Sequence, residues 1–199
     1  MCLVETWLDH NISDSEIHLP GFHLYRLDRN RHGGGILMYA QHNLIVNVLP
    51  SQLENNVPHN LEFLPISVRH KNFKVGIALF YKPPSAPSLI FDTLFEVMNS
   101  LNIAQFCNFI FLGDFNINYN DPSHHLYSKL CNISHFLNLT QVVTGSTHTS
   151  PHGNPSLIDL AFMSSPCQLL DCCVIPPIAN SDHNGLKIRV NWKPSAQLP

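Results

Sequence analysis

The sequence contains few charged residues and no excess of basic ones. Only 13% of its 199 residues are charged, and the formal net charge is −3 at pH 7. Proteins that grip nucleic acid through its phosphates usually carry a basic surface, so this balance argues against strong autonomous DNA binding. Hydrophobic residues make up 44% of the chain, which excludes a disordered tail and predicts a buried core.

Long apolar runs are also missing. The longest, at 75–80 and 109–112, have the length of strands and are far shorter than a membrane span. The first residues contain no basic region and carry Glu5 within the apolar run, unlike a secretory signal. We therefore expect one intracellular domain, nuclear or cytoplasmic, over residues 1–193 and a frayed tail at 194–199, with no membrane partner.

Several common site patterns are absent as well. The six cysteines form no Cys-x-x-Cys pair, and the 13 histidines are scattered at positions typical of loops. Neither distribution has the spacing of a zinc site. The glycine triplet at 33–35 lacks the Gly-Lys-Ser/Thr ending of a phosphate-binding loop and precedes a predicted strand, so we interpret it as a tight turn.

Short apolar segments rich in β-branched and aromatic residues do recur between Gly, Pro, Asn and Asp. They predict strands at 2–6, 35–39, 44–49, 61–68, 73–81, 109–113 and 187–192. Two further segments, 88–103 and more weakly 123–137, place apolar residues at helical spacing. Apolar strands mixed with amphipathic helices predict an α/β domain whose sheets are covered by helices.

The first candidate site follows the apolar segment 109–112. Gly113 ends this segment, and the next polar residues, Asp114 and Asn116, point to the same side if strand alternation continues. Asp114 is then suited to orient or deprotonate a water, and Asn116 to donate a hydrogen bond to a phosphate oxygen. For this segment alone, an Asx turn that satisfies its own backbone remains an alternative.

A second candidate lies near the C-terminal end. Asp159 falls inside the apolar segment 156–162, where a buried carboxylate needs a partner. His183 follows Ser181 and Asp182 and can supply it. A hydrogen bond between Asp159 and His183, within about 3.2 Å, would fix the imidazole tautomer and favour its charged form beside a phosphate.

Two more polar residues, Glu5 and Tyr81, each end an apolar segment, the position where α/β folds bind ligands. Taken singly, Glu5 is more simply a solvated acid and Tyr81 an amphipathic residue at a sheet edge. Together, the candidates are expected to converge at one end of the sheets: Glu5, Tyr81, Asp114, Asn116, Asp159, Asp182 and His183.

The candidates belong to short motifs that follow one another along nearly the whole chain. In order these are Glu5-Thr6-Trp7-Leu8, Asp28-Arg29-Asn30 with Gly33-Gly34-Gly35, Tyr81-Lys82-Pro83-Pro84, Gly113-Asp114-Phe115-Asn116, Ile158-Asp159-Leu160 and Ser181-Asp182-His183. The ordered set resembles the endonuclease/exonuclease/phosphatase superfamily and, within it, the endonuclease domains of LINE-type (non-LTR) retrotransposons. The resemblance implies a four-layered α/β sandwich of two mixed β-sheets flanked by helices.

The resemblance also implies a metal-dependent phosphodiester hydrolase that nicks DNA and is associated with a reverse transcriptase. Glu5 would bind the catalytic Mg²⁺ or Mn²⁺, with Asp182 close to the metal. Asp114 would activate the water, and Asp159 would orient His183. The charge that develops on phosphorus would be stabilised by Asn116, Tyr81 and His183.

Relatives in this superfamily begin with a further strand and helix that this sequence does not contain before Glu5. The resemblance therefore implies a fold lacking its first strand and helix, which puts activity in doubt. Three functions remain open: a metal-dependent DNA-nicking domain, an inactive retroelement remnant or binding module, and a phosphatase of the same superfamily.

Overall fold

A computed structural model describes residues 1–50, 61–149 and 153–191, so the predicted tail lies outside the described residues. Its largest element is a six-stranded sheet of order β4-β5-β6-β7-β9-β8. These strands are β4 (Ile45–Val48), β5 (Glu62–His70), β6 (Phe73–Tyr81), β7 (Asn108–Asp114), β8 (Thr140–Gln141) and β9 (Asp159–Met163). The sheet is mixed because β6 and β7 are parallel whereas the other neighbours are antiparallel.

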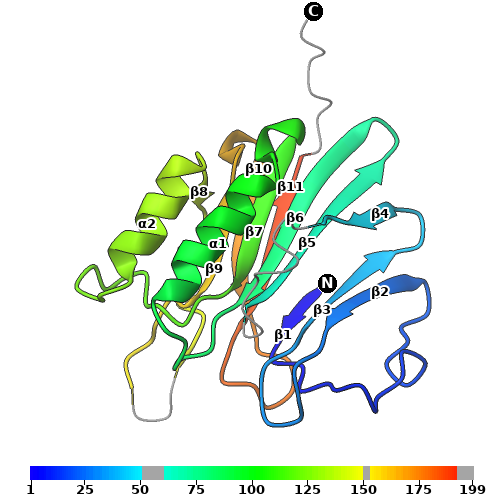
Figure 1. Cartoon of the computed structure of the whole chain (residues 1–199), viewed down its shortest axis with the longest axis horizontal. Helices are drawn as coiled ribbons and strands as arrows, with labels where there is room; N and C mark the ends of the chain where they lie inside the picture. Colours follow the sequence, from blue (N-terminus) through cyan, green and yellow to red (C-terminus); the bar gives the residue numbers. More distant parts are fainter. Residues whose placement is uncertain (51–60, 150–152, 192–199) are drawn as a thin grey trace, which may run out of the picture.

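Two helices, α1 (Leu89–Ser100) and α2 (Tyr127–Phe136), cover one face of this sheet (Figure 1). The parallel pair β6-β7 requires a crossover connection, and α1 with the short 3₁₀ turn η1 (Ile103–Gln105) provides it. The apolar face of α1 packs on alternate strand residues such as Phe80 and Phe111. These rings, with Phe115 and Phe162, form the centre of the core and lie 5.1 to 6.0 Å apart where they meet.

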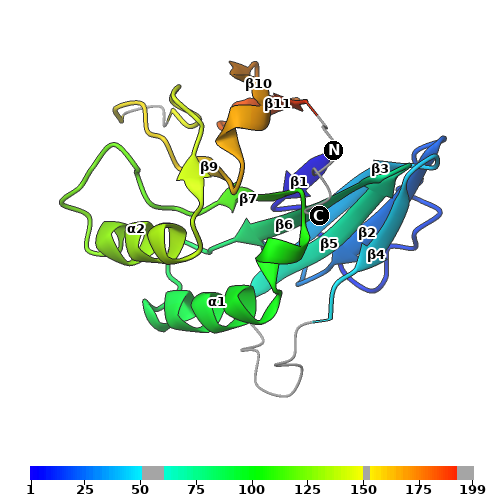
Figure 2. The same ribbon diagram turned by 90° about the horizontal axis from the view of Figure 1, so that it is seen from above.

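The opposite face of the large sheet carries two smaller antiparallel sheets (Figure 2). One has the order β1-β3-β2, and the other is the hairpin β10-β11 after the turn η2. Their bounds are β1 (Cys2–Val4), β2 (Phe22–Leu27), β3 (Ile36–Gln41), η2 (Pro166–Gln168), β10 (Leu169–Ile175) and β11 (Gly185–Val190). Ile36 and Met38 of β3 pack on Ile66 and Leu79, which alternate with the helix-facing positions of β5 and β6.

The predicted α/β class is confirmed, with sheets stacked in layers and helices outside. Within the described residues, no strand pairing joins the two small sheets, so the second layer is divided where one sheet was expected. Helices cover the large sheet on one face, while the small sheets have none in the described part of the chain. No helix there is long and apolar enough to span a membrane.

Candidate active site

The centre of the candidate site is a row of side chains at one level of the large sheet. Tyr81, at the end of β6, is in register with Asp114 at the end of β7, and Asp114 is in register with Asp159 at the start of β9. Residues opposite one another in a ladder point to the same face. Strand pairing therefore gathers three of the predicted residues from distant parts of the sequence.

Asp159 and His183 form the predicted pair. The Asp159 Oδ2 atom lies 2.9 Å from Nδ1 of His183, and both side chains are largely buried. This hydrogen bond, opposed by burial, raises the pKa of His183 to about 9. The imidazole is therefore charged at neutral pH, with Nδ1–H donating to Asp159 and Nε2–H directed elsewhere.

Thr147 holds Asp159 in place and was not identified from the sequence. Its hydroxyl oxygen accepts hydrogen bonds from the backbone N–H groups of Ile158, at 3.2 Å, and of Asp159, at 2.9 Å. Thr147 is fully buried, so these are the contacts that compensate the loss of water for all three groups. A lone threonine in a loop gives no sequence signal of this role.

Asp114 and Asn116 contact one another. The Asp114 Oδ1 atom accepts from the backbone N–H of Asn116 at 2.8 Å, which is the Asx turn considered as the alternative. The Asn116 amide also donates to Asp114 Oδ2 and to the carbonyl of Lys82, at 3.0 and 2.8 Å. Burial, and then the nearby charge of Asp159, raises the pKa of Asp114 to about 7.

Glu5 reaches the row from the second layer. It follows β1 with a φ of +53°, and its carboxylate accepts a hydrogen bond from the Tyr81 hydroxyl. Burial and this carboxylate raise the pKa of Tyr81, so the phenol stays protonated. The next residue, Thr6, donates from its backbone N–H to the carbonyl of Gly35, which ties the Glu5 segment to the predicted glycine turn.

Glu62, on β5 of the large sheet, supports this glycine turn, and its role was not predicted from the sequence. It is buried in register with Tyr81 on β5, and its carboxylate accepts from Arg29 at 2.9 Å and from the Gly35 N–H at 2.5 Å. Burial raises its pKa, although the Arg29 hydrogen bond opposes this. The sequence does carry a signal for Glu62, because it lies inside the apolar run Leu61-Glu62-Phe63 and, like Asp159, needs a partner when buried.

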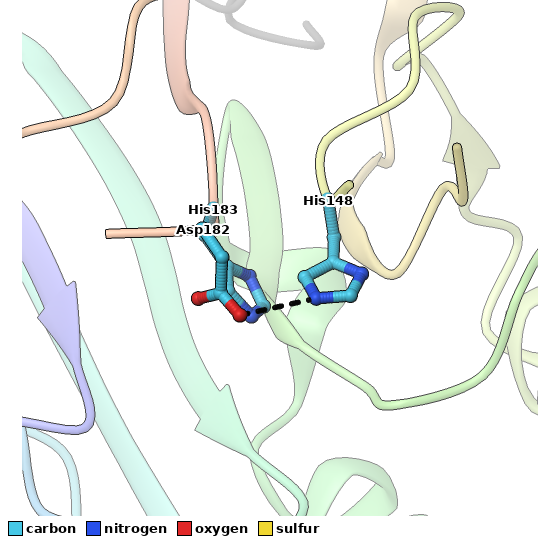
Figure 3. Close-up of side chains that lie close together, drawn as sticks. All are labelled: His148, Asp182 and His183. Carbon is cyan, nitrogen blue, oxygen red and sulfur yellow. Dashed lines mark ion pairs between the residues drawn. The ribbon is translucent and has the colours of Figure 1, made fainter. Parts of the chain in front are cut away.

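Asp182 lies at the rim of the site and is more than half exposed. Its Oδ2 atom is 3.4 Å from Nε2 of His148, a residue the sequence did not single out (Figure 3). Two groups of clustered metal-ligating atoms occur among the described residues: His148 with Asp182 and His183, and Asp114 with Asp159 and His183. Glu5 is in neither group, so a shared Glu5 and Asp182 metal site stays a prediction.

The pairing of Asp159 with His183 predicts a measurable change in titration. In metal-free protein, NMR should give a His183 pKa of about 9. The substitution Asp159→Asn removes the anionic acceptor, so this pKa should fall to or below the ordinary value of about 6.5. Asp171→Asn, which alters an exposed ion pair with Arg189, is the control and should leave it unchanged. An unchanged His183 pKa in Asp159→Asn would contradict the hydrogen bond to Asp159 as the cause of the raised value.

The family of the chain follows from its match to known proteins. A family model described as endonuclease-reverse transcriptase matches residues 75–187, more than half of the chain. The chain belongs to this family. The matched segment includes the positions from Tyr81 to His183, whereas Glu5 lies before it. No curated protein matches the chain.

Solved structures show the same fold at low sequence identity. The endonuclease domain of TRAS1, a telomere-specific non-LTR retrotransposon, matches with a TM-score of 0.69 and 18% identity over 86% of this chain and 81% of that one. The 3′ phosphatase NExo from Neisseria, bound to a product DNA hairpin, matches with a TM-score of 0.71 and 17% identity over 96% of this chain and 88% of that one. TDP2 from D. rerio, with a single-stranded DNA product, matches with a TM-score of 0.62 and 13% identity over 94% of this chain and 83% of that one. The chain therefore has the endonuclease/exonuclease/phosphatase fold, as its motif order predicts.

Proposed function

We propose that this domain is a metal-dependent phosphodiester hydrolase that nicks DNA, derived from a LINE-type retrotransposon. The observation that supports this most is the contrast between Asp114 and His183. Asp114 has a pKa of about 7 and His183 one of about 9, although their ligand atoms lie within 4.8 Å of one another. Between these values a base and a charged proton donor coexist, as general acid–base hydrolysis requires.

In this proposal Asp114 accepts a proton from the attacking water, and His183 donates from Nε2 to a phosphate oxygen. Asp159 keeps the imidazole charged and oriented through Nδ1. The Asn116 amide, now held by Asp114 and Lys82, turns one N–H toward the phosphate, and Tyr81 keeps Glu5 in position. The His183 Nε2–H and the released Asn116 N–H would then donate to charge that develops only during the reaction, which is the arrangement that accelerates it.

The carboxylates of the site fit a hard divalent cation. Burial raises the pKa of Asp114 most, and the nearby charges of Asp159 and Glu5 raise it further, so the site gathers several carboxylates. Mg²⁺ or Mn²⁺, with their preference for oxygen ligands, would relieve this repulsion. Glu5 would hold the ion, with Asp182 from the rim near it. The bound ion supplies polarisation of a phosphoryl oxygen.

DNA is the proposed substrate, as in the NExo and TDP2 complexes. A net charge of −3 gives little long-range attraction to the DNA backbone, so binding should be weak and directed mainly by the site. A second candidate is removal of a 3′ phosphate, because NExo, a 3′ phosphatase, matches 96% of the chain. The same base, imidazolium and metal would serve either reaction.

Incubation with supercoiled plasmid and with a 3′-phosphorylated oligonucleotide tests the proposal. With Mg²⁺ we expect nicked circles, and chelation by EDTA should remove the activity because the carboxylates then lack their cation. Phosphate release without nicking would favour the second candidate. Activity on neither substrate, with Mg²⁺ or Mn²⁺, would refute the proposed enzyme and favour a non-catalytic binding module.

A further inference from the structure

A group of nitrogen and oxygen ligand atoms lies at the rim, beside the proposed catalytic residues. His148 precedes β9 in sequence, and Asp182 with His183 precedes β11. Their ligand atoms lie within 4.8 Å of one another, and the two imidazole centroids are 4.8 Å apart. We propose that this group binds a transition-metal ion of the zinc class, at a site that shares Asp182 with the proposed hard-cation site but has two imidazole ligands in place of Glu5.

The hydrogen bonds of the two histidines support this site. The Nδ1 atom of His148 lies 3.2 Å from the hydroxyl of Ser156, and Nδ1 of His183 lies 2.9 Å from Asp159. Histidines that bind metals usually hydrogen-bond through their second ring nitrogen in this way, which fixes the ring and leaves the first nitrogen for the metal. In both residues the Nε2 atom is left for the metal, and the Asp182 carboxylate lies beside both rings (Figure 3).

The backbone holds the two segments together. His148 forms bridges with both Ser156 and His183. The Thr149 N–H donates to the carbonyl of Asp182 at 3.3 Å, and the Asn184 N–H donates to that of Thr147 at 2.7 Å. Ligands carried on segments that are already joined lose little freedom when an ion binds, so the site is largely preorganised.

The donor set selects zinc over magnesium. Two imidazole nitrogens and one carboxylate oxygen are typical ligands of Zn²⁺, which leaves a fourth position for water, whereas Mg²⁺ prefers oxygen alone. The 3.4 Å between His148 Nε2 and Asp182 Oδ2 already suits two ligands on one ion with bonds of about 2.0–2.2 Å. Asp182 is exposed, so an ion can enter.

Occupation of this site would block the reaction, a consequence that rests on the proposed function. A metal on Nε2 of His183 displaces the proton there to solvent, so the ring can no longer donate it to a phosphate. The ion also takes Asp182 away from the catalytic cation. Zinc therefore inhibits the reaction, because it occupies the His183 nitrogen that otherwise carries the donated proton, whereas Mg²⁺ supports activity.

Binding can be measured without any activity. The probe is Zn²⁺ by calorimetry, and Co²⁺ by its visible absorption spectrum, with the cysteines unchanged in every variant. His148→Ala removes one ligand and should weaken binding by more than the roughly 10- to 100-fold typical of outer-shell changes. Ser156→Ala removes only the outer partner and should fall within that range. His18→Ala, an exposed histidine outside the group, should bind like the unmodified chain.

Equal affinity in His148→Ala and the unmodified chain would overturn the site, as would a Co²⁺ spectrum that lacks imidazole coordination. The inhibition is tested separately, as the nicking rate of each variant with Zn²⁺ divided by its own rate without Zn²⁺. Zinc should lower this ratio in the unmodified chain and in His18→Ala, and much less in His148→Ala. If nicking is absent altogether, the proposed function fails, while the binding measurement still decides the zinc site.

Discussion

Replacing Asp114 by Asn should lower the rate of plasmid nicking by about 10²–10⁴-fold, the usual contribution of a general base. The amide has the same shape and can still accept the Asn116 N–H through its oxygen. It cannot accept a proton from water, so the loss should appear in kcat. Asp92→Asn is the matched control, because Asp92 pairs with Lys129 on the helical face. It should nick at the unmodified rate.

The pH profile gives the same prediction a second test. Asp114 acts as a base only when ionised, so nicking should rise as pH increases through about 7. Binding of the catalytic cation favours the ionised form and would move this limb to lower pH. His183 must remain charged, so nicking should fall again as pH passes about 9. A profile with no acidic limb, or Asp114→Asn with undiminished activity, would exclude Asp114 as the base.

Sequence reasoning located the residues that interrupt an apolar run. Asp114 was found because it directly follows an apolar run that ends at Gly113. Asp159 was found because a carboxylate within an apolar run is costly without a partner, and His183 followed as that partner. Glu62 met the same criterion and was overlooked. The signal in these cases is local, since it consists of one polar residue among apolar neighbours.

Residues that act through long-range pairing left no such signal. His148 and Thr147 lie in a loop, and their roles appear only when that loop pairs with Ser156 and His183. The strand β2 was missed for a related reason, because it is only partly buried and alternates irregularly in Phe22-His23-Leu24-Tyr25-Arg26-Leu27, so it does not stand out as an apolar run. The strand β10 is apolar except for Asp171 and was overlooked. Their pairing partners decide that they are strands.

Substituting Gly113 by Ala should destabilise the fold and the site together. Gly113 has a φ of +149°, and a Cβ atom there would lie 1.7 Å from the backbone oxygen of Phe80. The atoms that this Cβ meets belong to the Phe80 backbone, so no side-chain rotamer change relieves the clash, and β6 and β7 must separate where they carry Tyr81 and Asp114. Strain and overpacking together should cost about 2–6 kcal/mol, a large share of the roughly 5–15 kcal/mol that stabilises a typical domain.

Urea denaturation of Gly113→Ala beside Gly21→Ala separates the two causes. Gly21 also has a positive φ, of +88°, but nothing lies within 4 Å of the Cβ position, so Ala there adds backbone strain without a clash. Gly21→Ala should lower the free energy of unfolding by the backbone strain alone, about 1–3 kcal/mol, and nicking should persist. Equal losses in the two variants would mean that β6 and β7 absorb the extra methyl group. The close approach of these strands would then not be what fixes Tyr81 beside Asp114.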